Sequence, residues 1–167
     1  MIARYLFNHQ MVGAVIEKVR CKTMDQTDSK IVLILQNNGR ISMKDLGFQV
    51  GLSAPAVAER VRRLEEKNVI FSYRAIINPV KLGKNISAFI MADVFSNKYQ
   101  AVVDYVKQNN NIVECHHTIG NNCLMLKVYV ESTEELKDII LALKPMAKTE
   151  TYVILSSVVD FKAIGKS

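Results

Sequence analysis

The stretch that decides the fold runs from residue 42 to residue 67 and reads SMKDLGFQVGLSAPAVAERVRRLEEK. Ser42 and Asp45 have the spacing of a helix N-terminus, where a hydroxyl caps free backbone N–H groups. Gly51 ends that helix, and Ser53 caps a second, longer one. Because only a few residues around Gly51 separate the two helices, the spacing predicts a helix-turn-helix motif.

The second helix of this motif has one apolar face. Val57, Val61 and Leu64 follow one another at steps of four and three residues, which is the period of a single helical face. The opposite face carries polar and basic side chains, as in a helix that enters the major groove of DNA. We expect base-proximal contacts from its N-terminal part and phosphate contacts from the rest: Ser53, Pro55, Ala56, Glu59 and Arg60 for the former, Arg62, Arg63 and Lys67 for the latter.

A plainer interpretation is that this face is only solvated, with Glu59 and Arg63 forming an i,i+4 pair worth about 0.2–0.5 kcal/mol. The distribution of charge along the chain argues against it. The 167 residues carry a net charge of +6, but residues 1–85 carry +7 and residues 86–167 carry −1. A basic half joined to a near-neutral half favours a polyanion-binding module. Together with the helix-turn-helix spacing, this favours DNA.

The segments on either side of the motif complete a first domain. Before it, the carboxylate of Asp25 can cap a helix by accepting a hydrogen bond from the N–H of Asp28. After it, residues 69–77 are rich in β-forming side chains and predict a hairpin or a single strand. We therefore assign residues 24–77 to a DNA-binding domain and residues 78–87 to a linker.

The second half of the chain alternates apolar strands and amphipathic helices. The order β-α-β-β-α-β predicts a ferredoxin-like antiparallel sheet with two helices on one face, so the fold class is α+β. The domain covers residues 88–162. Its expected strands are residues 87–95, 112–119, 123–130 and 151–159, and its expected helices are residues 99–109 and 133–143.

Such a sheet has one face that nothing in its own domain covers. Apolar groups of the strands at 88–95 and 151–159 would lie on that face. An exposed apolar sheet face predicts a homodimer, and a dimer also suits the reading of two DNA half-sites.

Short motifs follow one another in a fixed order along the first half: Asp25-x-x-Asp28-x-x-Ile31, Gly39-Arg40, Leu52-Ser53, Val61-x-x-Leu64-Glu65, Val69-Ile70, Tyr73-Arg74-Ala75, Asn78-Pro79 and Leu82-Gly83. Their order and spacing resemble the Lrp/AsnC, or feast/famine, family of transcriptional regulators, over about residues 24–162. The resemblance implies a winged helix-turn-helix that binds double-stranded DNA, joined to a ferredoxin-like effector domain. It also implies dimers that often assemble into octamers, and a response to amino acids bound between dimers. Asn68 departs from the family, which usually has Gly there.

The resemblance also places the small-molecule effector near a hairpin and near the start of the last helix. In the hairpin the family often has an Asp that binds the ligand's amine, where this chain has Asn121. Members that resemble the asparagine regulator also lack that Asp, so the hairpin is most similar to theirs. A neutral amide can hydrogen-bond a polar ligand but offers no charge-assisted contact. The implied effector-binding residues are Gly120, Asn121, Asn122, Cys123, Leu124, Ser132, Thr133 and Glu134.

Two other classes of function are weaker. Two-domain enzymes such as the sirohaem decarboxylases are similar in architecture, but no nucleophile elbow, phosphate loop or paired-carboxylate motif is present, so we expect no enzyme and no cofactor. Cys115, His116, His117 and Cys123 invite a metal hypothesis. Strand alternation sends the two histidines to opposite faces of the sheet, so we expect no metal.

The cellular location follows from what the chain lacks. Three cysteines make an odd number without framework spacing, which fits a reducing compartment. The chain has no run of about 18 apolar residues, the length that a membrane-spanning helix needs. We expect a cytoplasmic, nucleoid-associated protein without a membrane partner. Residues 1–23 are an N-terminal extension with three interpretations: a weak helix, a partner-binding arm, or translation begun upstream of the natural start, which we favour.

Overall fold

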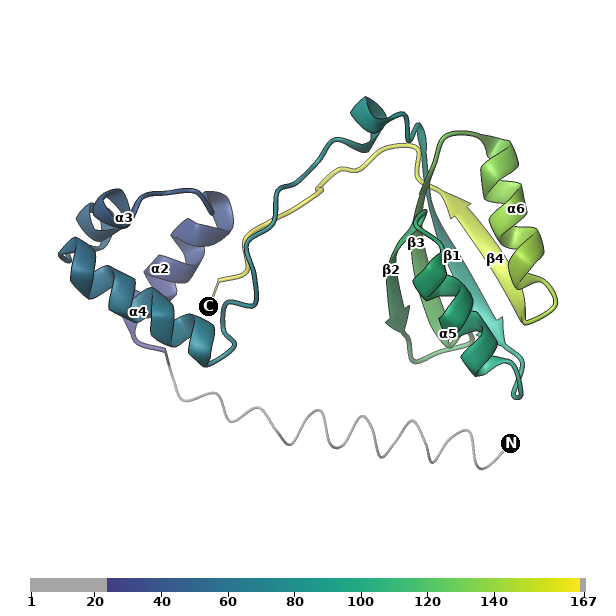
Figure 1. Cartoon of the computed structure of the whole chain (residues 1–167), viewed down its shortest axis with the longest axis horizontal. Coiled ribbons are helices and arrows are strands. Elements are labelled where there is room, and N and C mark those ends of the chain that lie inside the picture. Colours follow the sequence, from purple (N-terminus) through teal and green to yellow (C-terminus); the bar gives the residue numbers. More distant parts are fainter. Residues whose placement is uncertain (1–23, 166–167) are drawn as a thin grey trace. The chain divides into compact units, whose positions relative to one another are not determined.

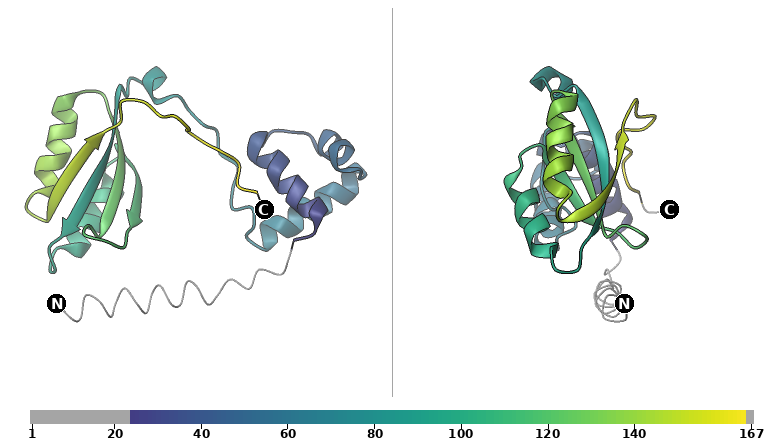
Figure 2. Two further views of the ribbon diagram at one scale, coloured as in Figure 1. Left: turned by 180° about the vertical axis from the view of Figure 1, so that it is seen from behind. Right: turned by 90° about the vertical axis from the view of Figure 1, so that its right-hand side faces the viewer.

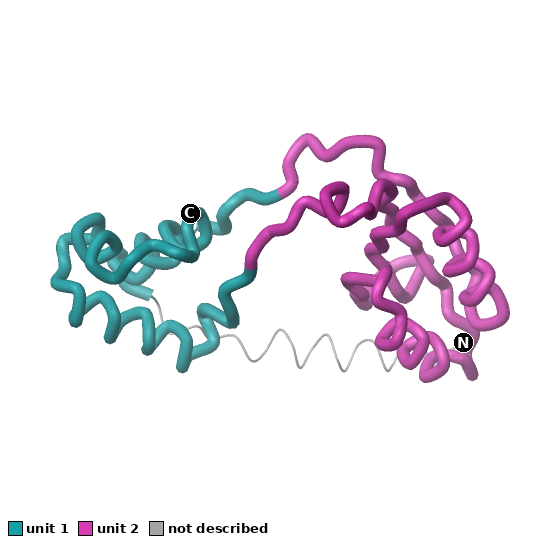
Figure 3. The backbone as a smooth tube through the Cα atoms, turned by 45° about the horizontal axis from the view of Figure 1, so that its top comes forward, with its two compact units in different colours: residues 1–74, 161–167 teal, residues 75–160 magenta. Residues whose placement is uncertain are grey.

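The computed structural model describes residues 24–165, so the predicted N-terminal extension lies outside the described residues. The chain divides into two compact units, residues 1–74 with 161–167 and residues 75–160 (Figure 3). We call them the helical unit and the α/β unit. None of the described helices is long and apolar enough to cross a membrane.

The helical unit contains the three predicted helices. Each begins at its predicted cap: the side chains of Asp25, Ser42 and Ser53 accept a hydrogen bond from the backbone N–H three residues further along. The caps supply partners for N–H groups that the first turn of a helix leaves free. The helices are α2 (Gln26–Asn37), α3 (Met43–Val50) and α4 (Ala54–Glu66) (Figure 1).

One apolar cluster holds the three helices together. It consists of Ile31 and Leu35 from α2, Leu46 from α3, and Val57, Val61 and Leu64 from α4. These are the inner faces that helical periodicity predicts. Because α4 turns this stripe inward, its opposite face is left on the surface.

The turn between α3 and α4 is tight. Gly51 has a φ of 72°, in the left-handed region that favours glycine, and ends α3. The N–H of Leu52 donates to the carbonyl oxygen of Gly47 over 2.8 Å. A Cβ on Gly47 would lie only 2.6 Å from the carbonyl oxygen of Leu52. The two backbones can therefore approach this closely only because residue 47 lacks a side chain.

The predicted hairpin or strand at residues 69–77 is wrong for the single chain. Residues 71–78 have no regular secondary structure, and the described sheet is built from other segments. A strand needs a neighbouring strand to complete its hydrogen-bond ladder. Because no described segment pairs with residues 69–77, they form no strand. Tyr73 is held instead by its hydroxyl, which donates to Glu65 over 2.9 Å. Burial, with the Glu65 carboxylate nearby, raises the pKa of Tyr73 to about 12 and keeps it a donor.

Asn68, just after α4, adopts a φ of 54°, a left-handed conformation that side chains other than Gly tolerate poorly. We expect Asn68→Gly to stabilise the helical unit by about 0.5 kcal/mol, because relief of strain slightly exceeds the added freedom of the unfolded chain. Asn68→Ala should destabilise it by about 1 kcal/mol, since alanine cannot hydrogen-bond locally in this conformation. Urea unfolding monitored by circular dichroism should give stabilities that fall in the order Asn68→Gly, native protein, Asn68→Ala. An alanine variant as stable as the native protein would contradict this account.

The α/β unit has the predicted β-α-β-β-α-β order. Its four strands form one antiparallel sheet in the order β2-β3-β1-β4, and both helices lie on the same face of it (Figure 2). The elements are β1 (Ile86–Val94), α5 (Tyr99–Gln108), β2 (Ile112–His117), β3 (Leu124–Val130), α6 (Thr133–Leu143) and β4 (Ala147–Val153). The last strand thus ends at residue 153 and not at residue 159 as predicted.

Strand alternation separates a packed face of the sheet from an open one. The packed face turns alternate residues of β1 and β3 onto Val102 of α5 and onto the buried side of α6. The residues between them, among them Phe89, Met91, Met125 and Tyr129, lie on the other face and are half-buried. Across this face Phe89 pairs in register with Lys127 on one side and Tyr152 on the other. We call it the open sheet face.

The end of the chain belongs with the helices and not with the sheet. The side-chain amide of Gln36 on α2 donates to the carbonyl oxygen of Ile164 over 2.8 Å, and the Ile164 N–H donates back to Gln36 Oε1 over 2.9 Å. The compact units divide between residues 74 and 75 and again between 160 and 161, a few residues from the predicted domain limits of 77 and 162. The side-chain amide of Gln36 thus pairs with the Ile164 backbone as a neighbouring strand would. The local sequence pattern cannot reveal this pairing, because the two residues are 128 positions apart.

Candidate nucleic-acid interface and effector site

The N-terminal end of α4 is positioned by its cap. The Ser53 hydroxyl oxygen accepts from the N–H of Ala56, and Pro55 occupies the first turn, where its missing N–H costs no hydrogen bond. Val57 is fully buried one residue further on. The structure therefore places Ser53, Pro55 and Ala56 together at the start of α4, as the sequence predicts.

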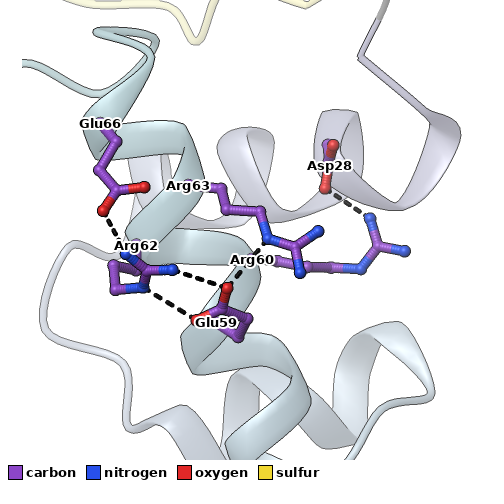
Figure 4. Close-up of polar contacts among 6 residues, drawn as sticks. All are labelled: Asp28, Glu59, Arg60, Arg62, Arg63 and Glu66. Atoms are coloured by element: carbon purple, nitrogen blue, oxygen red, sulfur yellow. Dashed lines mark hydrogen bonds and ion pairs between the residues drawn. The ribbon is translucent and has the colours of Figure 1, made fainter.

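Four charged side chains form one network along the exposed side of α4 (Figure 4). Arg62 donates through two nitrogens to the two carboxylate oxygens of Glu59, over 2.8 and 2.9 Å, and also pairs with Glu66. Arg63 donates to Glu59 over 3.0 Å, which confirms the i,i+4 pair expected from spacing. Hydrogen bonds from Arg62 and then from Arg63 lower the pKa of Glu59 to about 2, so this carboxylate stays charged near neutral pH. We call Glu59, Arg62, Arg63 and Glu66 the α4 charge network.

Arg60 is directed elsewhere. Its Nη1 lies 2.6 Å from Asp25 Oδ2 and 2.7 Å from Asp28 Oδ1, both at the start of α2, and its side chain is 32% exposed against 57% and 59% for Arg62 and Arg63. The structure thus pairs Arg60 within the protein, and the base contact that the sequence predicts for it stays a prediction. Arg60 joins α4 to the first turn of α2. Asp25 serves twice, since one carboxylate oxygen caps α2 and the other accepts from Arg60.

Some cations of the helical unit have no carboxylate partner among the described residues. Lys67, predicted as a phosphate contact, is one of them and lies at the C-terminal end of α4. Arg40 and Lys44, which the sequence prediction missed, flank the start of α3 and are also without an ion pair in the described chain. The signal that could have found them is the position of α3 as the first helix of the motif, since that helix usually crosses the DNA backbone.

The hairpin predicted to bind the effector is a short closed loop. The Thr118 hydroxyl donates to the carbonyl oxygen of Asn122 over 2.6 Å, and the Thr118 N–H donates to that of Cys123 over 3.1 Å. Asn121 is exposed and Asn122 is half-buried. Leu124 is fully buried in the core of the α/β unit. Its side chain is therefore covered within the α/β unit, and the ligand contact predicted for it stays a prediction.

The second predicted group lies at the other end of β3. Ser132 caps α6 by accepting from the N–H of Glu135 over 3.2 Å, with Thr133 and Glu134 in the first turn. The whole of β3 separates this group from Gly120 and the hairpin. At about 3.4 Å per residue a seven-residue strand is more than 20 Å long. Within one chain, the two halves of the predicted effector site do not come together.

The cysteine and histidine residues do not converge. The Tyr99 hydroxyl lies 2.8 Å from His117 Nε2 and the two rings stack, whereas His116 pairs with Glu114 over 3.2 Å on the open sheet face. Among residues 24–165, no group of three or more His, Cys, Asp or Glu side chains could hold a metal ion. Desolvation raises the pKa of the Cys115 thiol, which favours its protonated form.

A capped helix-turn-helix unit joined to a βαββαβ domain defines the class of two-domain DNA-binding regulators. The AsnC-type helix-turn-helix family model matches residues 24–65, and the Lrp/AsnC ligand-binding domain model matches residues 87–164. The chain belongs to the Lrp/AsnC family of transcriptional regulators. Its helical unit is the DNA-binding domain, and its α/β unit is the domain that binds a small-molecule effector.

Curated relatives agree with this assignment over most of their length. LrpC of Bacillus subtilis is 37% identical over 81% of this chain and 94% of its own. YezC of the same organism is 42% identical over 80% and 95%, and the leucine-responsive regulatory protein of Haemophilus influenzae is 34% identical over 86% and 90%. All three are transcriptional regulators or regulatory proteins by name and not enzymes, which confirms the predicted regulator over the enzyme alternative.

Solved structures of the family show the same fold. Bacillus subtilis LrpC superposes with a TM-score of 0.79 at 36% identity, over 83% of this chain and 99% of that one. Escherichia coli AsnC superposes with a TM-score of 0.74 over 84% and 97%, but at only 22% identity. The likeness to AsnC therefore shows the shared fold alone. The prediction of a special similarity to the asparagine regulator was too narrow.

Proposed function

We propose that α4 is the recognition helix and that Arg62, Arg63 and Lys67 supply its phosphate contacts. The observation that carries the proposal is the outward face of α4, on which Arg62 and Arg63 are more than half exposed while the opposite stripe is buried. Ser53, Pro55 and Ala56 at its N-terminal end are proposed to lie near base edges, with Glu59 beside them. Arg40 and Lys44 extend the basic surface to α3. Arg60 holds α4 in place.

We also propose a homodimer, and the open sheet face supports it. Phe89, Met91, Met125 and Tyr129 lie on this face around Lys127, and Tyr152, at 57% exposure, borders them. A second copy packed on this face would remove these side chains from water and place two copies of α4 on one DNA molecule. We propose further that the dimers assemble into octamers. We propose also that the protein is cytoplasmic and associated with the nucleoid.

DNA footprinting tests this arrangement. The protein should protect discrete sites made of two inverted half-sites whose centres are about 10–10.5 base pairs, or a multiple of that, apart. Sedimentation of the free protein should give the mass of two chains or a multiple of it. Protection of single half-sites by a monomer would contradict the dimer, and uniform coating without discrete sites would contradict sequence-specific regulation.

We also propose that the effector is an amino acid bound between copies of the chain. Two observations support this: the two predicted halves of the site lie at opposite ends of β3, and a relative at 34% identity is a leucine-responsive regulatory protein. Asn121 and Asn122 would hydrogen-bond the polar groups of the ligand, with Ser132 and Thr133 contributed by a neighbouring copy. Binding would favour one assembly over another and thereby change the spacing of the DNA-binding domains.

A thermal-shift screen of the twenty amino acids tests the effector. A ligand present at 100 times its dissociation constant stabilises the protein by about 2.7 kcal/mol, so a specific binder should raise the melting temperature by several degrees. The matched control is Asn121→Ala with Asn122→Ala, which should remove the shift and leave the melting temperature of the ligand-free protein unchanged. If no amino acid raises the melting temperature at millimolar concentration, the effector belongs to another chemical class.

A further inference from the structure

The α4 charge network is electrically neutral although it lies on the basic half of the chain. Glu59 and Glu66 balance Arg62 and Arg63, and all four side chains are between 42% and 59% exposed. Three hydrogen bonds of 2.8–3.0 Å tie the two arginines to Glu59 alone. Arg62 and Arg63, two of the three cations proposed to contact phosphate, are thus already paired before DNA arrives.

This pairing bears on specificity more than on affinity. Non-specific binding of proteins to DNA comes almost wholly from contacts between cations and phosphates. An arginine held by a carboxylate must give up that partner before it can contact a phosphate, and the carboxylate itself repels the DNA backbone. At a cognate site, base contacts can offset this cost, whereas on random DNA the protein makes no such base contacts.

Resting on the DNA-binding role of α4 proposed above, we infer that Glu59 is a positioning residue that holds Arg62 and Arg63 away from non-specific DNA and so widens the gap between cognate and random sequence. Glu66 contributes through Arg62 only and has the smaller part. Glu59 is the centre of the network because both arginines converge on it (Figure 4).

The same helix offers a matched control. Glu65 is one residue from Glu66, but its carboxylate accepts a hydrogen bond from Tyr73 and from no arginine among the described residues. Glu65→Gln therefore changes the net charge of α4 as much as Glu59→Gln does and releases no arginine. A comparison of the two separates the effect of freed arginines from that of net charge.

The experiment measures binding of the full-length protein, native and variant, to a cognate fragment and to a random fragment of equal length, by fluorescence anisotropy over a salt series. For Glu59→Gln we expect about fivefold tighter binding to random DNA, and a salt slope steeper by about 0.9 for each arginine that gains a phosphate. Affinity for the cognate fragment should rise less, so the ratio of cognate to random affinity falls. Glu66→Gln should show a smaller change in the same direction, and Glu65→Gln less still.

Three results would overturn the inference. Equal gains for Glu59→Gln and Glu65→Gln would reduce the effect to net charge. Weaker binding to both fragments, with a lower melting temperature, would make Glu59 merely structural. Loss of cognate affinity at unchanged random affinity would make Glu59 a base contact. Absence of any DNA binding by the native protein is a separate result, and it would count against the proposed role of α4 itself.

Discussion

Replacement of Gly47 by alanine is expected to destabilise the helical unit by about 2–3 kcal/mol, the upper part of the range for overpacking. Helix propensity alone predicts the opposite sign, since alanine is about 1 kcal/mol better than glycine inside a helix. The new methyl group would lie 2.6 Å from the Leu52 carbonyl oxygen and 3.4 Å from backbone atoms of Ser53. Backbone atoms cannot rotate away as a side chain can, so the turn between α3 and α4 must open.

The control for this substitution is Gly39→Ala. A Cβ there would meet its nearest neighbours, the Leu35 carbonyl oxygen and the Tyr73 ring, at 3.6 Å, which is ordinary van der Waals contact. We expect a change within about 0.5 kcal/mol. Urea unfolding monitored by the helical circular dichroism signal gives both values. Because opening of the turn also tilts α4, Gly47→Ala should weaken DNA binding at temperatures where the protein is still folded. A Gly47→Ala protein as stable as the native one would contradict the close approach.

Removal of both exposed arginines of α4, Arg62→Ala with Arg63→Ala, should weaken binding to cognate DNA at least about tenfold at moderate salt and lower the salt slope by about 1.8. Two phosphate contacts are lost, each of which releases about 0.9 counterions. The loss is enlarged because Glu59 and Glu66 are then left without partners and repel the backbone. Anisotropy titrations at four or more salt concentrations give both the affinity and the slope.

Two variants show whether the effect is local to these side chains. Lys107→Ala with Lys137→Ala removes the same charge from helices α5 and α6 of the effector domain, and should leave the slope unchanged. Arg60→Ala removes a cation from α4 itself. Because Arg60 is bound to Asp25 and Asp28, its loss should weaken affinity through movement of α4 without lowering the slope. A fall in slope for Arg60→Ala equal to that of one exposed arginine would show that Arg60 contacts a phosphate.

The elements that could be predicted are those whose signals are short-range. Asp25, Ser42, Ser53 and Ser132 each cap the helix assigned to them, because a cap and its N–H partner are three residues apart. The strand predicted at residues 69–77 was wrong because strand formation depends on a partner distant in the sequence. Its side chains favour extended backbone, but a strand exists only where a second strand completes the ladder, and the described chain supplies none there.

The candidate sites show the same contrast between short-range and long-range features. The exposed face of α4 and the Glu59–Arg63 pair could be predicted, since both follow from helical spacing. The partners of Arg60 could not, because Asp25 and Asp28 are 35 and 32 residues away. Leu124 lies at the start of the strand predicted at residues 123–130, but its complete burial depends on the pairing of β3 with β1 and β2.

By itself the sequence determined the order of helices and strands, their caps and their apolar faces, and through these the family and its two domains. All of these depend on hydrogen bonds and periodicities within a few residues. Only the tertiary structure decided which arginines of α4 remain exposed, which one is bound to α2, and that the two halves of the predicted effector site lie a full strand apart. Those facts depend on distances through space between side chains far apart in the chain. Electrostatic pairing responds to such distances and not to separation along the sequence.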